Sequence, residues 1–325
     1  MRRLLLPAVL VLSVLVPGSL AGASSATAGR PHPMPTVPAT VTFGAYVPGM
    51  ESDPEALTRF ESTVGTSVGI ASYYYGYGDI FPGPTELALA DGGRRDVLVA
   101  WNMGQAPFRS WAAGDQDAYL DQIAAAARSY PYPLYVRPWP EMNGDWQDFQ
   151  PTPDGGLPAG GTYAEFRAAW QHVVGYLREH GATNLRWVFN PTADTYAGTT
   201  PIDEIWPGRD YVDVLGLDGF NWGNGGFFHW QSFSDIFLTQ YRNLTALDPT
   251  APVWICETGS KEPAVDDGAP VDRRHKKAQW VSDMFRFTGM PRLTALVWFN
   301  ARKERDWRVN SSSGSLQAFR KALTG

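Results

Sequence analysis

The sequence has very little cysteine and little histidine. Cys256 is the single cysteine among 325 residues, so no disulfide framework can form within the chain. The five histidines form neither an H-E-x-x-H pattern nor a Cys/His ligand spacing, the usual signatures of a transition-metal site. P-loop and dinucleotide-binding glycine patterns are missing as well. The sequence therefore implies no metal and no cofactor.

An excess of positive charge and long apolar runs are also missing. The formal net charge is -6, which gives no electrostatic reason to bind nucleic acid or anionic lipid. After residue 40, no apolar run reaches the roughly 17 to 25 residues that a membrane-spanning helix needs. We therefore expect a mature protein that binds neither nucleic acid nor membrane, and we expect it to be a monomer.

The N-terminus has the pattern of a secretory signal peptide. Arg2 and Arg3 precede an apolar run that ends at Val16, and small residues follow as far as Ala28. The run is too short for a membrane anchor, and the order of segments is typical of an exported protein. We predict a secreted, extracellular product with a signal peptide over residues 1–28, a Pro-rich leader over 29–39 and one domain over 40–325.

Short apolar or β-branched runs alternate with amphipathic segments over that domain. The predicted strands are residues 41–46, 67–75, 96–101, 133–139, 185–190, 211–218, 252–257 and 293–300. The predicted helices are residues 53–64, 114–130, 162–181, 232–247, 272–287 and 314–323. This alternation predicts a single α/β domain with the (β/α)₈ TIM-barrel fold. A doubly wound open sheet is the rival, but the glycine-rich turn that usually follows its first strand is absent.

Two glutamates follow or end predicted strands at positions suited to catalysis. In a parallel barrel the active site is built at the carboxyl ends of the strands. Glu141 follows the fourth predicted strand and Glu257 ends the seventh, both within apolar sequence. Glycoside hydrolysis needs such a pair, one acid to protonate the leaving oxygen and one carboxylate to attack or to activate water. The alternative is that each glutamate pairs with an arginine, for instance Arg137, and only stabilises the barrel.

Two other hypotheses remain open. The "GTSVG" stretch matches the G-x-S-x-G motif of serine hydrolases, but Ser67 opens a predicted strand instead of following one, so a secreted esterase is the weaker hypothesis. The chain has 13 Trp, 14 Tyr and 16 Phe, more flat surface than a core needs. These rings suit a carbohydrate cleft, so a non-catalytic carbohydrate-binding barrel is the other alternative.

Four ordered segments resemble glycoside hydrolase family 26: "RPWPEMNGDW", "YVDVLGLDGFNW", "ICETGS" and "LVWFNARKERDWRVNSS". The resemblance extends from about residue 101 to 319 and is to a family of retaining (β/α)₈ enzymes. It implies that Glu141 is the general acid/base and Glu257 the nucleophile. The positions that we assign to substrate binding, with core packing as the alternative for the tryptophans, are Trp101, Arg137, Trp146, Asp218, Phe220, Trp222 and Trp298.

Two residues depart from the family pattern. Pro140 stands where the family usually has histidine, and Phe220 stands where it usually has tyrosine. Both changes remove a hydrogen-bonding group near the expected catalytic subsite, so another residue has to orient Glu257. The resemblance implies a secreted retaining endo-β-glycanase acting on a plant-type polysaccharide or its oligosaccharides. The main expectation is β-1,4-mannan, with mixed-linkage β-1,3-1,4-glucan or β-xylan as alternatives.

Overall fold

The computed structural model describes residues 41–53, 55–225, 228–263 and 276–324. The predicted signal peptide and the leader lie outside the described residues, as does the first part of the predicted helix 272–287. Within the described ranges, no helix is long and apolar enough to cross a membrane.

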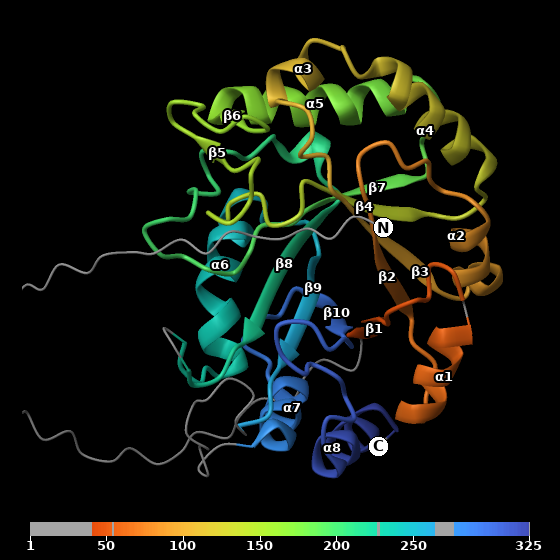
Figure 1. Cartoon of the computed structure of the whole chain (residues 1–325), viewed down its shortest axis with the longest axis vertical. Helices are drawn as coiled ribbons and strands as arrows, with labels where there is room; N and C mark the ends of the chain where they lie inside the picture. Colours follow the sequence, from red (N-terminus) through yellow and green to blue (C-terminus); the bar gives the residue numbers. More distant parts are fainter. Residues whose placement is uncertain (1–40, 54, 226–227, 264–275, 325) are drawn as a thin grey trace, which may run out of the picture. The chain divides into compact units, whose positions relative to one another are not determined.

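Eight parallel strands form a closed barrel (Figure 1). The last strand pairs with the first, and Thr42 lies opposite Ala295 in that register. The (β/α)₈ prediction is confirmed and the open-sheet rival is wrong. In chain order the strands are β1 (Thr42–Tyr46), β2 (Ile70–Tyr75), β3 (Asp96–Trp101), β4 (Leu134–Pro138), β7 (Leu185–Phe189), β8 (Val214–Asn221), β9 (Val253–Ser260) and β10 (Leu293–Phe299).

Helices follow the strands along the chain, and α6 packs on β8 while α7 contacts β9 and α8 (Figure 1). Thr162 caps α5 as a reciprocal capping box with Glu165, which explains where that helix begins. A two-stranded sheet, β5 (Pro151–Thr152) with β6 (Gly161–Thr162), lies outside the barrel strands. The α-helices are α1 (Glu55–Val64), α2 (Pro84–Leu89), α3 (Phe108–Ala112), α4 (Asp117–Ser129), α5 (Tyr163–Glu179), α6 (Phe233–Leu247), α7 (Lys277–Arg286) and α8 (Ser313–Thr324).

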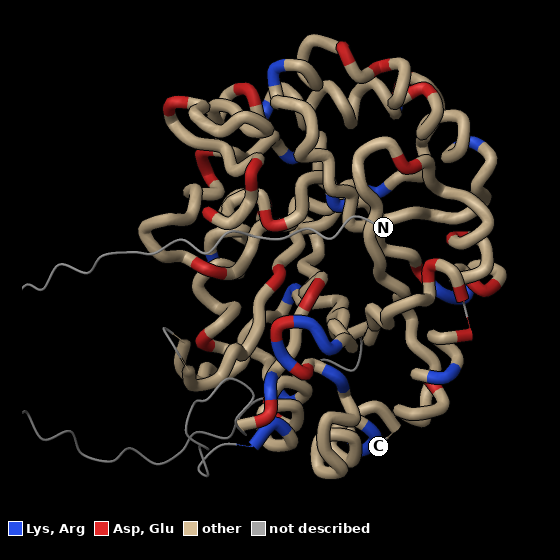
Figure 2. The backbone as a smooth tube through the Cα atoms, viewed as in Figure 1, with Lys and Arg blue, Asp and Glu red and all other residues tan. Residues whose placement is uncertain are grey.

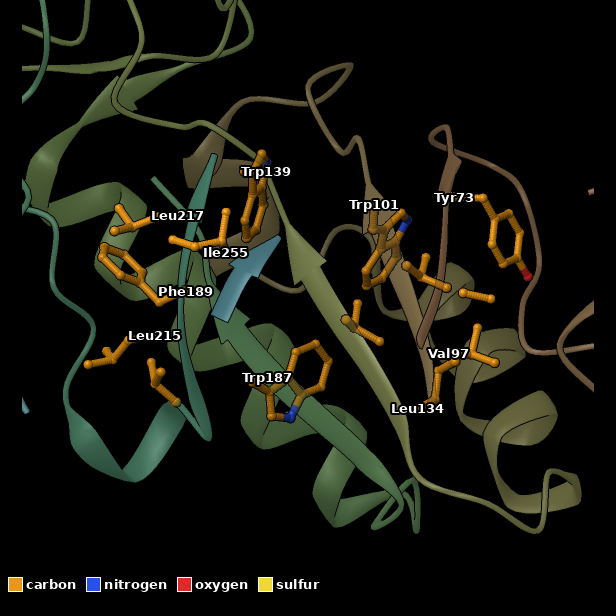
Figure 3. Packing of buried hydrophobic residues seen from close by; sticks show 14 of the residues in the cluster. Tyr73, Val97, Trp101, Leu134, Trp139, Trp187, Phe189, Leu215, Leu217 and Ile255 are labelled. Carbon is orange, nitrogen blue, oxygen red and sulfur yellow. The ribbon is translucent and has the colours of Figure 1, made fainter. Parts of the chain in front are cut away.

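The barrel strands separate two apolar cores because side chains alternate along each strand. The outer core lies between strands and helices, and Figure 3 shows members such as Val97, Trp187 and Leu217 there. A smaller cluster fills the barrel interior and includes Cys256, buried as a small apolar residue. Its members are Ile70, Leu98, Val188, Val214, Trp254, Cys256, Ala295 and Val297. This apolar filling closes the barrel below the polar groups at its carboxyl end.

Acidic and basic residues are both spread over the described part of the chain (Figure 2). Lys277, at the start of α7, is a basic residue whose side chain is fully buried. Its ammonium donates to the carbonyls of Trp307 (3.1 Å) and Arg308 (2.7 Å) and to Ser311 Oγ (2.9 Å). These bonds attach α7 to the loop that follows β10, so that loop has a defined position at the barrel mouth.

Candidate active site

Glu141 lies on a turn with unusual backbone geometry. Trp139 and Glu141 have φ values of 46° and 55°, in the left-handed region that residues other than glycine rarely adopt. The Trp139 amide donates to the Trp101 carbonyl (3.0 Å), and the Glu141 amide donates to the Asn190 carbonyl (2.8 Å). Pro138 and Pro140 restrict the chain further because their rings fix φ. Local strain of this kind persists only where neighbouring contacts impose it, and it concentrates at functional sites.

A bulge in β9 brings Glu257 to the barrel mouth. Trp254 and Cys256 face the barrel interior, so regular alternation would direct the next side chain outward. The register of β9 against both neighbours shifts between Ile255 and Thr258, and Glu257 then lies opposite Asp218. The extra residue lets Cys256 and Glu257 both face inward. The strand continues to Ser260, so Glu257 does not end it, contrary to the sequence prediction.

Arg137 joins two carboxylates across the barrel mouth. Its guanidinium is completely buried and donates to Asp218 Oδ2 (2.6 Å) and to Glu257 Oε1. The Nη1 atom that donates to Asp218 also donates to Asn190 Oδ1 (3.3 Å). Burial raises the pKa of Asp218 against the opposing effect of the Arg137 charge. The structure therefore brings together Arg137, Asp218 and Glu257, three of the residues that the sequence indicated.

Glu141 has the electrostatics of a proton donor. Burial raises its pKa to about 7, the negative charge of Glu257 adds to the rise, and a hydrogen bond from Trp146 opposes it. Trp139 and Met142, which lie close to Glu141 in the sequence, are buried in the core. One guanidinium faces three carboxyl groups here, so a proton on Glu141 relieves repulsion. At neutral pH Glu141 can donate a proton while Glu257 remains paired with Arg137.

Trp146 lies beside the acid, where the sequence placed it. Its indole Nε1 donates to Glu141 Oε2 (3.1 Å), and 45% of the residue is exposed. The turn that carries Trp146 is attached to the loop after β7 through the buried Asn143, which exchanges bonds with the Thr192 backbone (2.7 and 3.2 Å). Sequence reasoning missed Asn143, although its position two residues after Glu141 was the available signal.

The structure corrects the assignments of Trp101 and Trp298. Both side chains are fully buried on the outer face of the barrel, and Figure 3 shows Trp101 in that packing. The Trp101 indole donates to the Tyr119 hydroxyl (3.2 Å), and the Trp298 indole donates to the Trp307 carbonyl (2.9 Å). A ring without exposed surface has no face for a sugar, so both tryptophans are core residues. The sequence located these strand ends but not which way the last side chains point.

Phe220 lies on β8 and Trp222 directly follows that strand. Phe220 is two residues past Asp218, is partly exposed, and contacts the Phe299 ring edge-on at 5.8 Å. Trp222 stacks on Phe228 with ring centroids 5.0 Å apart. Position 220, where the family usually has tyrosine, thus lies on the strand that pairs with β9, and the role of both rings in substrate binding stays a prediction.

Other chemistries find little support in the structure. Ser67 lies before β2, at the amino end of the barrel, and lines a cavity of about 560 Å³. The cavity lining contains no histidine, aspartate or glutamate, so a serine nucleophile has no base there. In the described ranges, no group of three or more His, Cys, Asp or Glu side chains could hold a metal ion.

The fold agrees with comparisons to known proteins. Residues 112–281, a range that contains both glutamates, match the family model for glycosyl hydrolase family 26. The chain belongs to this family. It is also 30% identical over 286 residues to Endoglucanase H of Acetivibrio thermocellus. That match covers 86% of this chain but 30% of the relative, so this chain spans about a third of that protein's length.

Solved structures of family 26 share the barrel. A β-mannanase from Bacteroides ovatus has a TM-score of 0.57 at 16% identity and covers 88% of this chain and 89% of its own. A mannanase from Bacillus subtilis has a TM-score of 0.54 at 18% identity, with coverages of 88% and 85%. A ruminal endo-β-1,4-mannanase has a TM-score of 0.58 at 12% identity, with coverages of 88% and 63%. At these identities the likeness establishes the fold.

The arrangement around Glu141 predicts how its carboxyl group titrates. Trp146→Phe removes a donor to the ionised carboxylate, so the pKa of Glu141 should rise above about 7. Glu257→Gln removes a neighbouring negative charge, so the same pKa should fall. Carbon-13 NMR of glutamate-labelled protein measures both shifts. Shifts in the same direction, or none in either variant, would contradict this account of the site.

Proposed function

We propose that the protein is a retaining endo-β-glycanase in which Glu141 is the acid/base and Glu257 the nucleophile. The observation that carries this proposal is the pairing of Glu257 with Arg137 beside a glutamate whose pKa is raised to about 7. Retaining hydrolysis needs one carboxyl protonated and one ionised at the same time. A pair in which each glutamate had its own arginine would not meet that need.

In the first step Glu257 attacks the anomeric carbon while Glu141 donates its proton to the departing glycosidic oxygen. The bond to the leaving sugar breaks, and an ester forms between the substrate and Glu257. In the second step a water molecule attacks the anomeric carbon and gives its proton to Glu141, while the ester bond breaks and Glu257 leaves as a carboxylate. Both carboxyl groups return to their starting protonation states.

The electrostatics of the pair supports both roles of Glu141. The charge of Glu257 contributes to the raised pKa of Glu141, so that pKa should fall once Glu257 has become an uncharged ester. Glu141 then ionises and can accept the proton from water. Trp146 favours this ionised form because its indole N–H donates to the carboxylate. The same side chain thus serves as acid in one step and as base in the next.

For the substrate, we propose a β-linked glucan backbone, with β-1,4-mannan as the second candidate. Pro140, directly before the acid, has no side-chain group that can bond a sugar hydroxyl, which removes one means of selecting the axial 2-hydroxyl of mannose. The relative that matches at 30% identity is named an endoglucanase, whereas the mannanases match at 12 to 18%. Mannan was the main expectation from sequence and remains untested.

The substrate is tested by incubation with barley β-glucan, galactomannan, β-1,4-xylan and β-1,3-xylan, followed by sizing of the products. We expect the fastest release from barley β-glucan, as oligosaccharides of several sugars because an endo enzyme cuts within the chain. Faster cleavage of galactomannan would support the second candidate instead. Binding to these polymers without any product would support a non-catalytic carbohydrate-binding barrel.

Substitution of the two glutamates separates their roles. Glu257→Ala should lower kcat by roughly 10⁴-fold or more on every substrate, because no ester can form. The kcat of Glu141→Ala on polysaccharide should be lower by roughly 10²- to 10⁴-fold. With an aryl glycoside whose leaving group needs no proton, the rate of the ester-forming step should fall much less in this variant. Glu179→Ala, an exposed position at the end of α5, is the control and should leave kcat unchanged.

We also propose that the protein is exported, on the basis of the predicted signal peptide over residues 1–28. The measurement is N-terminal sequencing of the protein recovered from the medium of cells that express the full chain. A mature N-terminus at Gly29 is expected. Retention of the whole chain inside the cells would argue against export.

A further inference from the structure

Tyr74 is a tyrosine at the barrel mouth that sequence reasoning did not select. It lies on β2, two residues after Ser72 and four after Ile70, whose side chain belongs to the interior cluster. Alternation therefore directs Tyr74 toward the barrel axis. The next residue back, Tyr73, faces the opposite way and is buried in the outer core (Figure 3). Tyr74 is 40% exposed, so it reaches the open end of the barrel.

Tyr74 contacts both partners of the ion pair that holds the nucleophile. Its hydroxyl lies close enough to the Glu257 side chain that, after burial, the charge of that carboxylate and hydrogen bonding to it raise the pKa of Tyr74. The guanidinium carbon of Arg137 lies over its ring, 5.7 Å from the centroid. The Tyr46 ring supports Tyr74 edge-on, with centroids 5.0 Å apart at 79°. The tyrosine is thus held in place by its ring and presents its hydroxyl to the carboxylate.

We propose that Tyr74 is a positioning residue that keeps Glu257 ionised and oriented for attack. The inference rests on the proposed function of Glu257 as nucleophile. Phe220, on the strand next to β9, has no group that can donate to this carboxylate. Tyr74 provides a hydroxyl donor from β2 instead. It keeps its own proton throughout, and it acts on the reaction only through Glu257.

The surroundings of Glu257 make such a donor necessary. Asp218 is a second acid beside Glu257, and a negative charge on it disfavours another ionised carboxyl group there. Arg137 neutralises one charge and is shared between Asp218 and Glu257. A neutral donor adds stabilisation to the ionised form without a further charge. The titratable and charged groups that face Glu257 are Tyr46, Tyr74, Arg137, Glu141, Asp218 and Cys256.

Tyr74→Phe tests the inference because it removes the hydroxyl and keeps the ring that packs on Arg137 and Tyr46. With less stabilisation of the carboxylate, a larger share of Glu257 should carry a proton at acid pH. The acid limb of the kcat/KM profile should therefore move to higher pH, by about one unit for the loss of one bond to a charged group. The alkaline limb, which reports Glu141, should move less. Activity at pH 5 should fall more than activity near pH 7.

Tyr73→Phe is the matched control, because it removes a hydroxyl from the same strand on the opposite face. That hydroxyl lies 3.4 Å from the Tyr75 hydroxyl, which donates to Glu86 and not to Glu257. The pH profile of kcat/KM for Tyr73→Phe should match that of the unsubstituted protein. An acid limb that stays in place in Tyr74→Phe would overturn the inference while leaving the proposed function intact.

A second measurement does not depend on any substrate. Carbon-13 NMR of the Glu257 carboxyl group should show its titration at higher pH in Tyr74→Phe than in Tyr73→Phe. Equal titration curves would overturn the inference. If no polysaccharide is cleaved, the proposed function fails, and the NMR comparison still decides whether Tyr74 stabilises the ionised Glu257.

Discussion

The site depends on one buried guanidinium. Arg137 has no exposed surface and joins Asp218 of β8 to Glu257 of β9. Three buried charges are costly to remove from water, and their mutual attraction offsets that cost only when the geometry is good. Loss of the arginine would leave two carboxylates facing each other, at a cost of roughly 3 to 5 kcal/mol for the broken pair. The barrel interior is therefore organised around this pairing as much as around its apolar layers.

Two local irregularities turn a regular barrel into a site. The bulge in β9 makes Glu257 face inward directly after Cys256, and the left-handed turn after β4 directs Glu141 to the same opening. Neither arrangement is favourable by itself, since a bulge interrupts the ladder and positive φ strains residues with a side chain. Bonds from Trp139 and Glu141 to the neighbouring strand ends hold the turn. The regular parts of the fold thus impose the geometry that the reaction needs.

The sequence predicted the eight strands, the barrel and both glutamates, because apolar periodicity and position along the chain carry that information. The sequence did not predict which way the side chains at the strand ends point. Trp101 and Trp298 end or nearly end their strands, yet both rings point outward and are buried. The sequence shows that side chains alternate between the two faces of a strand, but it does not show which residues face inward. The bulge at Glu257 also changes, within a single strand, which residues face inward. Tyr74 had a signal in "SYYY", but only the closed barrel shows which of its tyrosines faces the axis.

The aromatic residues of the mouth explain why position 220 accommodates phenylalanine. Phe220 contacts Phe299, Phe299 stacks on Tyr46, and Tyr46 meets Tyr74, with centroids 5.8, 4.9 and 5.0 Å apart. On its other side Phe220 packs against Trp307 at 5.0 Å. These rings give the Phe220 side chain apolar contacts that need no hydroxyl. At the other end of the row, Tyr74 has Glu257 within reach. The hydrogen-bond donor therefore lies at the end of the aromatic row where a carboxylate can accept from it.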